Sequence, residues 1–389
     1  MRIGIILSQP PGYSETFFRS KILGLQENGV EVRLFCQNKN DDFTLCPVVV
    51  SPRVSMNPFL QLWFFIKEFV FLLPYVSTVI RYVKLERAEG TGWKQVFKKL
   101  YLNAHLLKAK LDWLHFGFAT MALGSETVAK AIGAKMAVSF RGFDINVYPL
   151  KHPNCYQLLW KQVDRVHTIS SYLLEKAYDL GLQKSVPYQL ITPAVNLKEM
   201  PQRENTDRLK TFKIVTVARL NWIKGIDYLI EVAACLKQTH INFEWQVIGS
   251  GSDFEKERYI YHIYEKGLEK QVILKGKCSH RETLKMLSEA DVYVQTSVNE
   301  GFCNAVLEAQ AIGVPCIAFK VGGLSENIQD NKTGWLIEPF EVGAMAKTIV
   351  DVSVMDTKSA TIIFEQSIKR VQNYFSLEQQ KTKFNKFYT

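Results

Sequence analysis

The chain has 389 residues, of which 47% are hydrophobic and 22% are charged. This length and composition are typical of a globular protein with two domains, and they exclude an intrinsically disordered chain. The net charge is +10, and residues 1–200 hold most of it, with 24 Lys and Arg against 15 Asp and Glu, which predicts an anionic surface or partner for that half.

The beginning of the chain predicts a βαβ unit. Residues 3–7 form a short apolar run that suits a buried parallel strand. Ser14 is the expected N-cap of a helix that ends near Gly29, and residues 30–35 form the next strand. The crossover between these two strands should be right-handed.

A long apolar and basic insert follows, over about residues 55–110. Residues 59–83 are rich in Phe, Leu, Trp and Val, but Lys67, Glu68 and Pro74 interrupt them, and the longest uncharged run has 12 residues. A membrane-spanning helix needs about 20. Two interpretations remain open: one or two buried helices, or a helix that lies in the membrane interface.

Basic residues follow the apolar stretch and are opposed only by Glu86 and Glu89. Anionic lipid attracts such clusters, and no nucleic-acid-binding module is recognisable, so the partner that we expect is an anionic membrane surface and not nucleic acid. The basic residues of this flank are Arg81, Lys84, Arg87, Lys94, Lys98, Lys99, Lys108 and Lys110.

The rest of the N-terminal half continues the α/β pattern, with a helix expected over residues 119–132 and Ser170 or Ser171 as the N-cap of a later helix. Residues 196–210 are polar and contain Pro201, which is typical of a linker. The strands expected in this half are residues 113–116, 136–140, 166–169 and 190–191.

A second α/β series begins after the linker, and its alternation predicts a doubly wound parallel sheet. We expect an N-terminal domain over residues 1–198, a C-terminal domain over 199–372, and a last helix in 373–389 that packs back toward the N-terminal domain. Ligands should bind at the carboxyl ends of the strands, in a cleft between the domains. The strands expected in the second series are residues 212–217, 244–248, 272–274, 292–295, 316–319 and 335–337.

The strongest chemical signal is the segment from Glu300 to Glu308, which follows a strand and opens a helix. Gly301 allows a close approach of the backbone to a ligand, and the free N–H groups at the helix start favour a phosphate or a sugar oxygen. Asn304 and Glu308 share one face of the helix. The alternative is that these are polar residues that flank a helix N-terminus, where acids are favoured anyway.

Two cations stand at an earlier junction between a strand and a helix. Arg219 ends the strand and Lys224 opens the helix, and a guanidinium with an ammonium suits a diphosphate, although solvated surface cations would look the same. Gly249 lies in a short glycine-rich turn after the next strand and is weaker evidence. Because three loops after three strands supply cations, glycines and carboxylates, one shared site is favoured.

These residues resemble the retaining glycosyltransferases of the GT-B fold, in the large group often called family 4. The group's two-glutamate motif matches Glu300 and Glu308, and its Arg and Lys-Gly motif matches Arg219, Lys224 and Gly225. Residues 309–326 also match the region after the motif, and residues 14–16 and 115–117 look like members that act in exopolysaccharide assembly. The resemblance covers essentially the whole chain and implies two Rossmann-like domains that face a cleft.

The resemblance implies roles for these residues. Arg219 and Lys224 would neutralise the leaving diphosphate, and Glu300 would orient the transferred sugar. Glu308 would accept hydrogen bonds from the ribose hydroxyls of the donor. Backbone N–H groups of the helix start would contact sugar and phosphate. The predicted donor-binding residues are Gly249, Gly301, Phe302, Cys303, Asn304, Ala305, Val306 and Glu308.

The matching segment of the N-terminal half departs from the group. Members usually carry a histidine where this chain has Arg141, which could bind phosphate or an acidic acceptor, or could pair locally with Asp144. By the same resemblance we predict Asp144 as a catalytic residue together with Arg219, Lys224 and Glu300. The predicted acceptor-side residues are Gly12, Ser14, Glu15, His115 and Arg141.

The chemistry follows from the same residues. No Asp-x-Asp motif occurs in the chain, so positioned cations and a helix N-terminus are expected to stabilise the leaving diphosphate without a metal or another cofactor. The expected reaction moves a hexose-type sugar from a nucleotide-diphosphate sugar to a glycan or lipid-linked acceptor. A sugar-nucleotide epimerase and a catalytically silent nucleotide-sugar-binding subunit are the alternatives, and the sugar, the base and the linkage stay open.

The cellular location is predicted from the absence of export signals. The seven cysteines include no Cys-x-x-Cys pair, which is typical of a reducing compartment. The apolar run at the beginning of the chain is too short for a signal peptide. We therefore expect a cytoplasmic protein that binds peripherally to the cytoplasmic face of the membrane.

Overall fold

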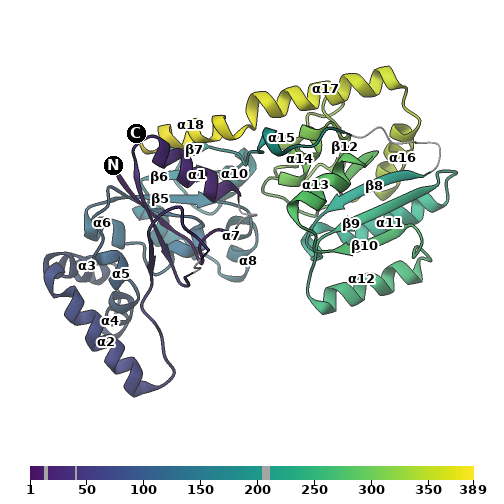
Figure 1. Cartoon of the computed structure of the whole chain (residues 1–389). Coiled ribbons are helices and arrows are strands. Elements are labelled where there is room, and N and C mark those ends of the chain that lie inside the picture. Colours follow the sequence, from purple (N-terminus) through teal and green to yellow (C-terminus); the bar gives the residue numbers. More distant parts are fainter. Residues whose placement is uncertain (13–15, 40–41, 204–210) are drawn as a thin grey trace. The chain divides into compact units, whose positions relative to one another are not determined.

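The computed structural model describes residues 1–12, 16–39, 42–203 and 211–389 (Figure 1). The chain divides into two compact units. The first holds Met1–Ile191 and Gln380–Thr389, and the second holds Thr192–Gln379. The sequence placed this division after residue 198. In the structure, residues after Ile191 already pair within the second unit, since Val195 forms a parallel bridge with Ser376.

The first unit is built on a seven-stranded sheet in the order β3-β2-β1-β4-β5-β6-β7, and every neighbouring pair is parallel. Most central strands are buried, because parallel strands are covered on both faces and therefore read as continuous apolar runs. The strands are β1 (Arg2–Ile6), β2 (Glu31–Cys36), β3 (Val48–Val50), β4 (Trp113–Phe116), β5 (Lys135–Phe140), β6 (Arg165–Thr168) and β7 (Tyr188–Leu190).

The predicted strands of this unit are confirmed within two residues, and Ser170 is the N-cap of α10 (Ser171–Asp179). The edge strand β3 was missed, because a run of three valines is too short to show the hydrophobic alternation that distinguishes a strand from a loop. The helix expected over residues 119–132 is wrong. It divides into η2 (Ala119–Ala122) and α6 (Val128–Ile132), because Gly124 adopts a φ of +85° that a helix cannot contain.

The other helices of the first unit include α1 (Thr16–Glu27), which covers the sheet after β1. Its predicted cap Ser14 lies outside the described residues. Short helices follow β5 and lead to β6. They are α7 (Phe143–Asn146), α8 (Tyr148–Lys151) and α9 (Gln157–Gln162).

The apolar insert forms α2 (Pro58–Leu72), η1 (Leu73–Tyr75), α3 (Val76–Ala88), α4 (Trp93–Leu102) and α5 (Ala104–Leu107). The interpretation as buried helices is wrong for α2, because Leu72 is its one buried residue. By length and composition the run Pro58–Ala88 could cross a membrane, and only 6% of its most apolar window is buried.

The second unit is built on a six-stranded parallel sheet in the order β10-β9-β8-β11-β12-β13. Each predicted strand is confirmed, four of them with identical bounds. The strands are β8 (Phe212–Val217), β9 (Phe243–Ile248), β10 (Val272–Gly276), β11 (Val292–Gln295), β12 (Cys316–Phe319) and β13 (Trp335–Ile337).

Helices alternate with these strands and bury their apolar faces against them in one core. Part of the predicted linker forms η3 (Leu197–Glu199), and its residues 204–210 lie outside the described ones. The remaining helices are η4 (Trp222–Lys224), α11 (Ile226–Lys237), α12 (Asp253–Glu265), α13 (His280–Ser288), α14 (Asn304–Ile312), α15 (Leu324–Asn327), α16 (Val342–Ser353) and α17 (Thr357–Tyr374).

The chain ends in α18 (Leu377–Tyr388), which Figure 1 shows in yellow after α17. Phe384, Phe387 and Tyr388 are buried in the core of the first unit with the residues of β1 and β2. Arg165 of β6 also donates a hydrogen bond to the carbonyl of Phe387. The last ten residues therefore fold as part of the first unit.

Candidate functional site

Four loops of the second unit meet at one edge of its sheet. They follow β8, β9, β11 and β12, and because these strands are parallel neighbours, their carboxyl ends lie together. The loops are tightly packed. A Cβ atom on Gly249 would overlap the carbonyl oxygen of Ala218, and one on Gly323 would overlap that of Gly301. Glycine is therefore required where the loops touch.

Lys224 and Glu300 form an ion pair at this edge, and their side chains also share a hydrogen bond. Lys224 ends η4, and Gly225 follows it in the left-handed region with a φ of +63°. This turn packs against the loop after β11, where the hydroxyl of Thr296 donates to the carbonyl of Gly225 over 2.9 Å. The turn brings together two side chains that are 76 positions apart in the sequence.

A buried polar chain holds the carboxylate of Glu300, which is 6% exposed. The hydroxyl of Ser297 donates to Oε1 of Glu300 over 2.8 Å, and the amide of Gln295 donates to Ser297 over 2.6 Å. Tyr293 donates in turn to Gln295, and burial raises the pKa of Tyr293 well above its usual value. The carboxylate is therefore fixed in one orientation before any ligand binds.

The electrostatics of the pair favour a charged lysine. Burial alone would lower the pKa of Lys224, but the neighbouring carboxylate of Glu300 outweighs it, so the pKa is raised. The charge of Arg219 opposes this rise, which places that guanidinium near enough to act on Lys224. Arg219 is exposed, and we find no ion pair for it within the described residues. The site therefore holds one fixed cation and one that is accessible.

The start of α14 lies beside this pair. Cys303 precedes the helix, and no side-chain hydrogen bond caps it. Asn327 clamps the backbone of Cys303, accepting from its N–H over 2.9 Å and donating to its carbonyl over 3.1 Å. Asn304 is exposed, whereas Phe302, Ala305 and Val306 are buried. The side chain of Asn304 and the backbone of the first turn are thus what this segment can offer a ligand.

Sequence reasoning missed the partner of Glu308. Nε2 of His280 lies 3.0 Å from Oε1 of Glu308. His280 is the first residue of α13, after Ser279, whose side chain forms a capping box with Glu282. The capping pattern of Ser279 and Glu282 could have located the helix start, but it could not reveal that His280 faces a residue 28 positions away.

The His280–Glu308 pair should make the stability of the second unit depend on pH. The hydrogen bond to Glu308 raises the pKa of His280, so the pair stabilises the fold fully below the unfolded pKa of about 6.5. That contribution is lost as the pH rises through the higher folded pKa. Because the histidine side chain is 30% exposed, we expect about 1 kcal/mol or less.

The measurement compares wild type with His280→Gln by urea unfolding between about pH 6 and about pH 8. The stability advantage of wild type should shrink toward the higher pH. An advantage that stays constant or grows over this range would contradict the assignment of the pair.

In the first unit, Asp144 is buried, with 1% of its surface exposed. Its carboxylate accepts hydrogen bonds from the backbone N–H groups of Ala119, Arg141 and Gly142, at 3.0, 3.1 and 2.9 Å. Burial nevertheless raises its pKa. The structure thus gives this predicted catalytic residue a structural position, in which it joins the loops after β4 and β5.

Arg141 stacks on aromatic rings. Its guanidinium carbon lies 3.9 Å from the ring centre of Phe17 and 4.7 Å from that of Phe18. Its backbone N–H donates a hydrogen bond to Oδ1 of Asp144. Stacking of this kind fixes the plane of the guanidinium, and α1 therefore sets the orientation of the cation.

His115 lies in the core and not on an open surface. It is fully buried in β4, where its Nδ1 lies 2.6 Å from the hydroxyl of Tyr388 and 3.1 Å from the ammonium of Lys21. Its Nε2 lies 2.7 Å from the hydroxyl of Ser139. Burial, and after it the charge of Lys21, lowers the pKa of His115 well below its usual value. A direct contact with an acceptor would require this network to open.

The remaining acceptor-side predictions are Gly12, Ser14 and Glu15, which lie between β1 and α1 in the sequence. Gly12 is partly exposed in the segment after β1. Ser14 and Glu15 lie outside the described residues. The predicted roles of all these residues remain predictions.

The chain is similar to known proteins in sequence and in fold. Residues 198–366 match the family described as glycosyl transferases group 1. WcaL of Escherichia coli K12, whose name assigns it to glycosyl transfer in colanic acid biosynthesis, is 27% identical over 271 residues, which cover 67% of this chain and 66% of WcaL. AmsK of Erwinia amylovora, an amylovoran biosynthesis glycosyltransferase, is 29% identical over 266 residues, 64% of this chain and 63% of AmsK.

The fold has a close counterpart among solved structures. HepE of Anabaena, solved in complex with UDP and glucose, superimposes with a TM-score of 0.73 at 16% identity, over 99% of this chain and 98% of HepE. The predicted fold class, GT-B with two Rossmann-like domains, is therefore confirmed. By sequence, residues 198–366 are similar to the group 1 glycosyl transferases, and the relatives WcaL and AmsK are named for the biosynthesis of colanic acid and amylovoran.

Proposed function

We propose that this protein transfers a hexose-type sugar from a nucleotide-diphosphate sugar to a glycan or lipid-linked acceptor. The observation that carries the proposal is the pair of Lys224 and Glu300 beside the exposed Arg219, at the carboxyl edge of the second sheet. The carboxylate suits sugar hydroxyls, and the cations suit phosphates. The edge therefore offers both kinds of partner that a nucleotide-sugar needs.

The transfer breaks the bond between the anomeric carbon and a phosphate oxygen. Positive charge develops on the carbon and negative charge on the leaving diphosphate. Arg219 and Lys224 would stabilise the diphosphate, together with the N-terminus of α14. The backbone of the first turn of α14 and the side chain of Asn304 would position the donor. Glu308, which His280 holds in place, would accept hydrogen bonds from the ribose hydroxyls.

We also propose that the sugar keeps its anomeric configuration. The acceptor hydroxyl would attack from the face that the diphosphate leaves, and its proton would pass to the leaving phosphate oxygen. The resemblance to retaining enzymes supports this step, and it requires no nucleophile from the protein.

The acceptor is proposed from the relatives. WcaL and AmsK are named for the synthesis of colanic acid and amylovoran, so a growing polysaccharide or its lipid-linked precursor is the acceptor class that we favour. HepE was solved with UDP and glucose, which makes UDP-glucose the first donor to test.

Transfer should need no metal ion, since Arg219 and Lys224 supply positive charge for the diphosphate. Dialysis against EDTA should leave turnover unchanged, and added Mg²⁺ or Mn²⁺ should not raise it. The measurement is nucleotide release with the donor and acceptor that support turnover. Activity that disappears with EDTA and returns with Mn²⁺ would overturn this part of the proposal.

A panel of nucleotide-sugars, tested with and without a lipid-linked acceptor, decides among the possible functions. Nucleotide release that depends on the acceptor supports transfer. An epimer formed without acceptor would instead show a sugar-nucleotide epimerase. Tight donor binding without any turnover would show a silent binding subunit, the alternative from another class of protein.

A further inference from the structure

The helix α2 is apolar on nearly every side, although it lies at the surface of the first unit. Its segment reads PFLQLWFFIKEFVFL, with Lys67 and Glu68 as its only charged residues. A helix that is apolar all round is normally buried in a core or in a membrane. Here seven large side chains are between 44% and 83% exposed: Phe59, Leu60, Leu62, Trp63, Ile66, Val70 and Phe71.

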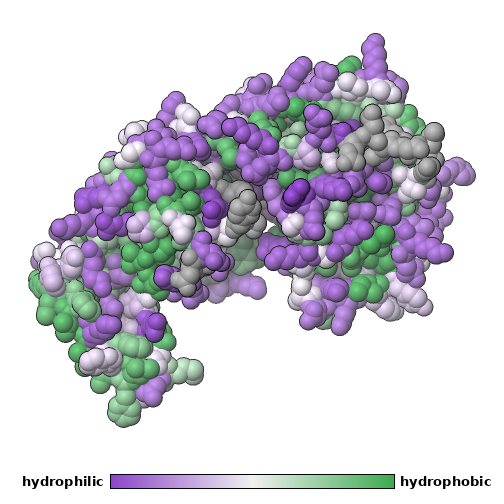
Figure 2. All heavy atoms as spheres, viewed as in Figure 1, coloured by the Kyte–Doolittle hydropathy of each residue, from purple (hydrophilic) through white to green (hydrophobic). Residues whose placement is uncertain are grey.

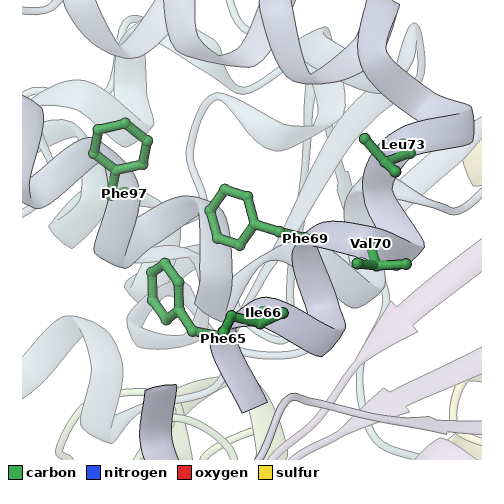
Figure 3. Close-up of a pocket in the computed structure, with 6 residues that line it drawn as sticks. All are labelled: Phe65, Ile66, Phe69, Val70, Leu73 and Phe97. Atoms are coloured by element: carbon green, nitrogen blue, oxygen red, sulfur yellow. The ribbon is translucent and has the colours of Figure 1, made fainter. Parts of the chain in front are cut away.

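The exposed apolar area extends beyond α2 onto η1 and α4. Figure 2 shows hydrophobic side chains gathered over the part of the first unit that holds these helices. A shallow depression of about 390 Å³ lies within it (Figure 3). Phe97 projects into it from α4, 48% exposed, and its other lining residues are Phe65, Ile66, Phe69, Val70 and Leu73. Single apolar side chains are common on protein surfaces, but here many of them lie together. Exposed apolar areas of this kind mark sites where a partner or a membrane binds.

Cations lie on and beside the helices that carry the apolar area. The neighbouring carboxylates are already neutralised: Glu68 pairs with Lys108 at 2.9 Å, Glu86 with Lys99 at 2.8 Å, and Glu89 lies 3.6 Å from Lys161. The cations that stay exposed on or beside these helices are Lys67, Arg81, Lys84, Arg87, Lys94, Lys98 and Lys110. Apolar area bordered by a net positive charge is complementary to an anionic lipid surface.

The packing of α3 argues against a membrane-spanning insert. Tyr82 and Glu86 of this helix are fully buried. Glu86 accepts hydrogen bonds from Lys99 and from the hydroxyls of Thr91 and Thr127, at 2.8, 2.9 and 2.6 Å. If α3 crossed a membrane, Glu86 would lose these hydrogen-bond partners and its charge would be buried without compensation. The helix α2 alone is about 22 Å long, shorter than a hydrocarbon core of about 30 Å.

We propose that α2, η1 and the exposed face of α4 form a docking surface that lies in the interface of an anionic phospholipid bilayer. The apolar side chains of α2 enter the boundary between headgroups and acyl chains, and the surrounding lysines and arginines contact the lipid phosphates. Glu86 and Tyr82 anchor the surface to the first unit. This surface belongs to the first unit, and its binding to lipid does not depend on the donor chemistry of the second.

Co-sedimentation with vesicles tests the surface without any nucleotide-sugar, so its outcome is independent of the transfer reaction. The full chain should bind vesicles of equal parts phosphatidylglycerol and phosphatidylcholine, and bind phosphatidylcholine alone at least about tenfold more weakly. The triple variant Trp63→Gln, Ile66→Gln, Val70→Gln should bind the mixed vesicles about a hundredfold more weakly. Because these side chains are exposed, the variant should stay folded.

A matched control comes from the second unit. Phe254, Ile260 and Tyr261 of α12 are similarly exposed, and their replacement by glutamine should leave vesicle binding unchanged. A charge-reversal variant, Lys84→Glu with Lys94→Glu and Lys98→Glu, should lose the preference for anionic vesicles. Quenching of tryptophan fluorescence by lipids brominated on the acyl chains should fall in Trp63→Phe.

Four results would overturn the proposal. They are wild-type binding by the triple variant, no binding of anionic vesicles by the full chain, a lipid-free dimer that the triple variant abolishes, and retention in membranes after carbonate extraction. The third would show a surface for a second copy of the chain, and the fourth would show a spanning segment.

Discussion

Replacing Arg219 with alanine should lower turnover by about 10²- to 10³-fold, a loss of about 2.7–4 kcal/mol of transition-state stabilisation. Arg219 follows the end of β8, and its charge acts on Lys224 in the same loop. Because the guanidinium is exposed and has no ion pair within the described part of the chain, its removal leaves no buried group unsatisfied. The loss should therefore appear in turnover and not in the free energy of unfolding.

The measurement is nucleotide release under saturating donor and acceptor, together with a thermal unfolding curve. Lys347→Ala is the matched control, since this exposed cation of α16 pairs with Asp351, one turn along the same helix. The control should keep normal turnover. Near-normal turnover of Arg219→Ala would remove Arg219 from the proposed mechanism.

Replacing Gly225 with alanine should destabilise the second unit by about 3 kcal/mol or more, the sum of backbone strain and overlap. Gly225 has a φ of +63°, which disfavours any residue with a Cβ, and that atom would overlap the carbonyl oxygen of Thr296. The carbonyl oxygen that the new Cβ would overlap belongs to the backbone, which cannot move aside as a side chain can. The turn that carries Lys224 should therefore shift, and donor binding should weaken as well.

Gly276→Ala separates the two contributions. Its φ is +74°, but no heavy atom lies within 4 Å of the added Cβ, so only the backbone strain of about 1 kcal/mol should remain. Urea unfolding of both variants gives the comparison. Equal destabilisation by the two alanines would show that the contact with Thr296 contributes nothing.

The strands could be predicted from the sequence because a buried parallel strand is a local pattern. Residues 212–217, 292–295 and 316–319 are short runs without charged residues except Lys213, and the strands have these bounds. The helix over residues 119–132 failed for a reason that is also local, since Gly124 can continue a helix or end it. Composition alone does not decide between those conformations.

The candidate site was predicted in part. Arg219, Lys224 and Glu300 are single residues in strand-to-helix loops, and the order of parallel strands brings such loops to one edge. The hydrogen-bonded chain from Tyr293 to Glu300 and the partnership of His280 with Glu308 were missed. Both depend on side-chain directions within the folded unit, which no spacing in the sequence reveals.

By itself, the sequence determined two α/β units, the strands of their sheets other than β3, and the loops that we predict to hold a diphosphate, because hydrophobic runs and turn residues act over a few positions. Only the tertiary structure decided that His115 is buried against Tyr388, 273 positions away, and that the apolar residues of α2 face outward. The sequence does not reveal whether an apolar side chain is buried in a core or exposed on a docking surface. Its burial is set by which distant elements pack against it.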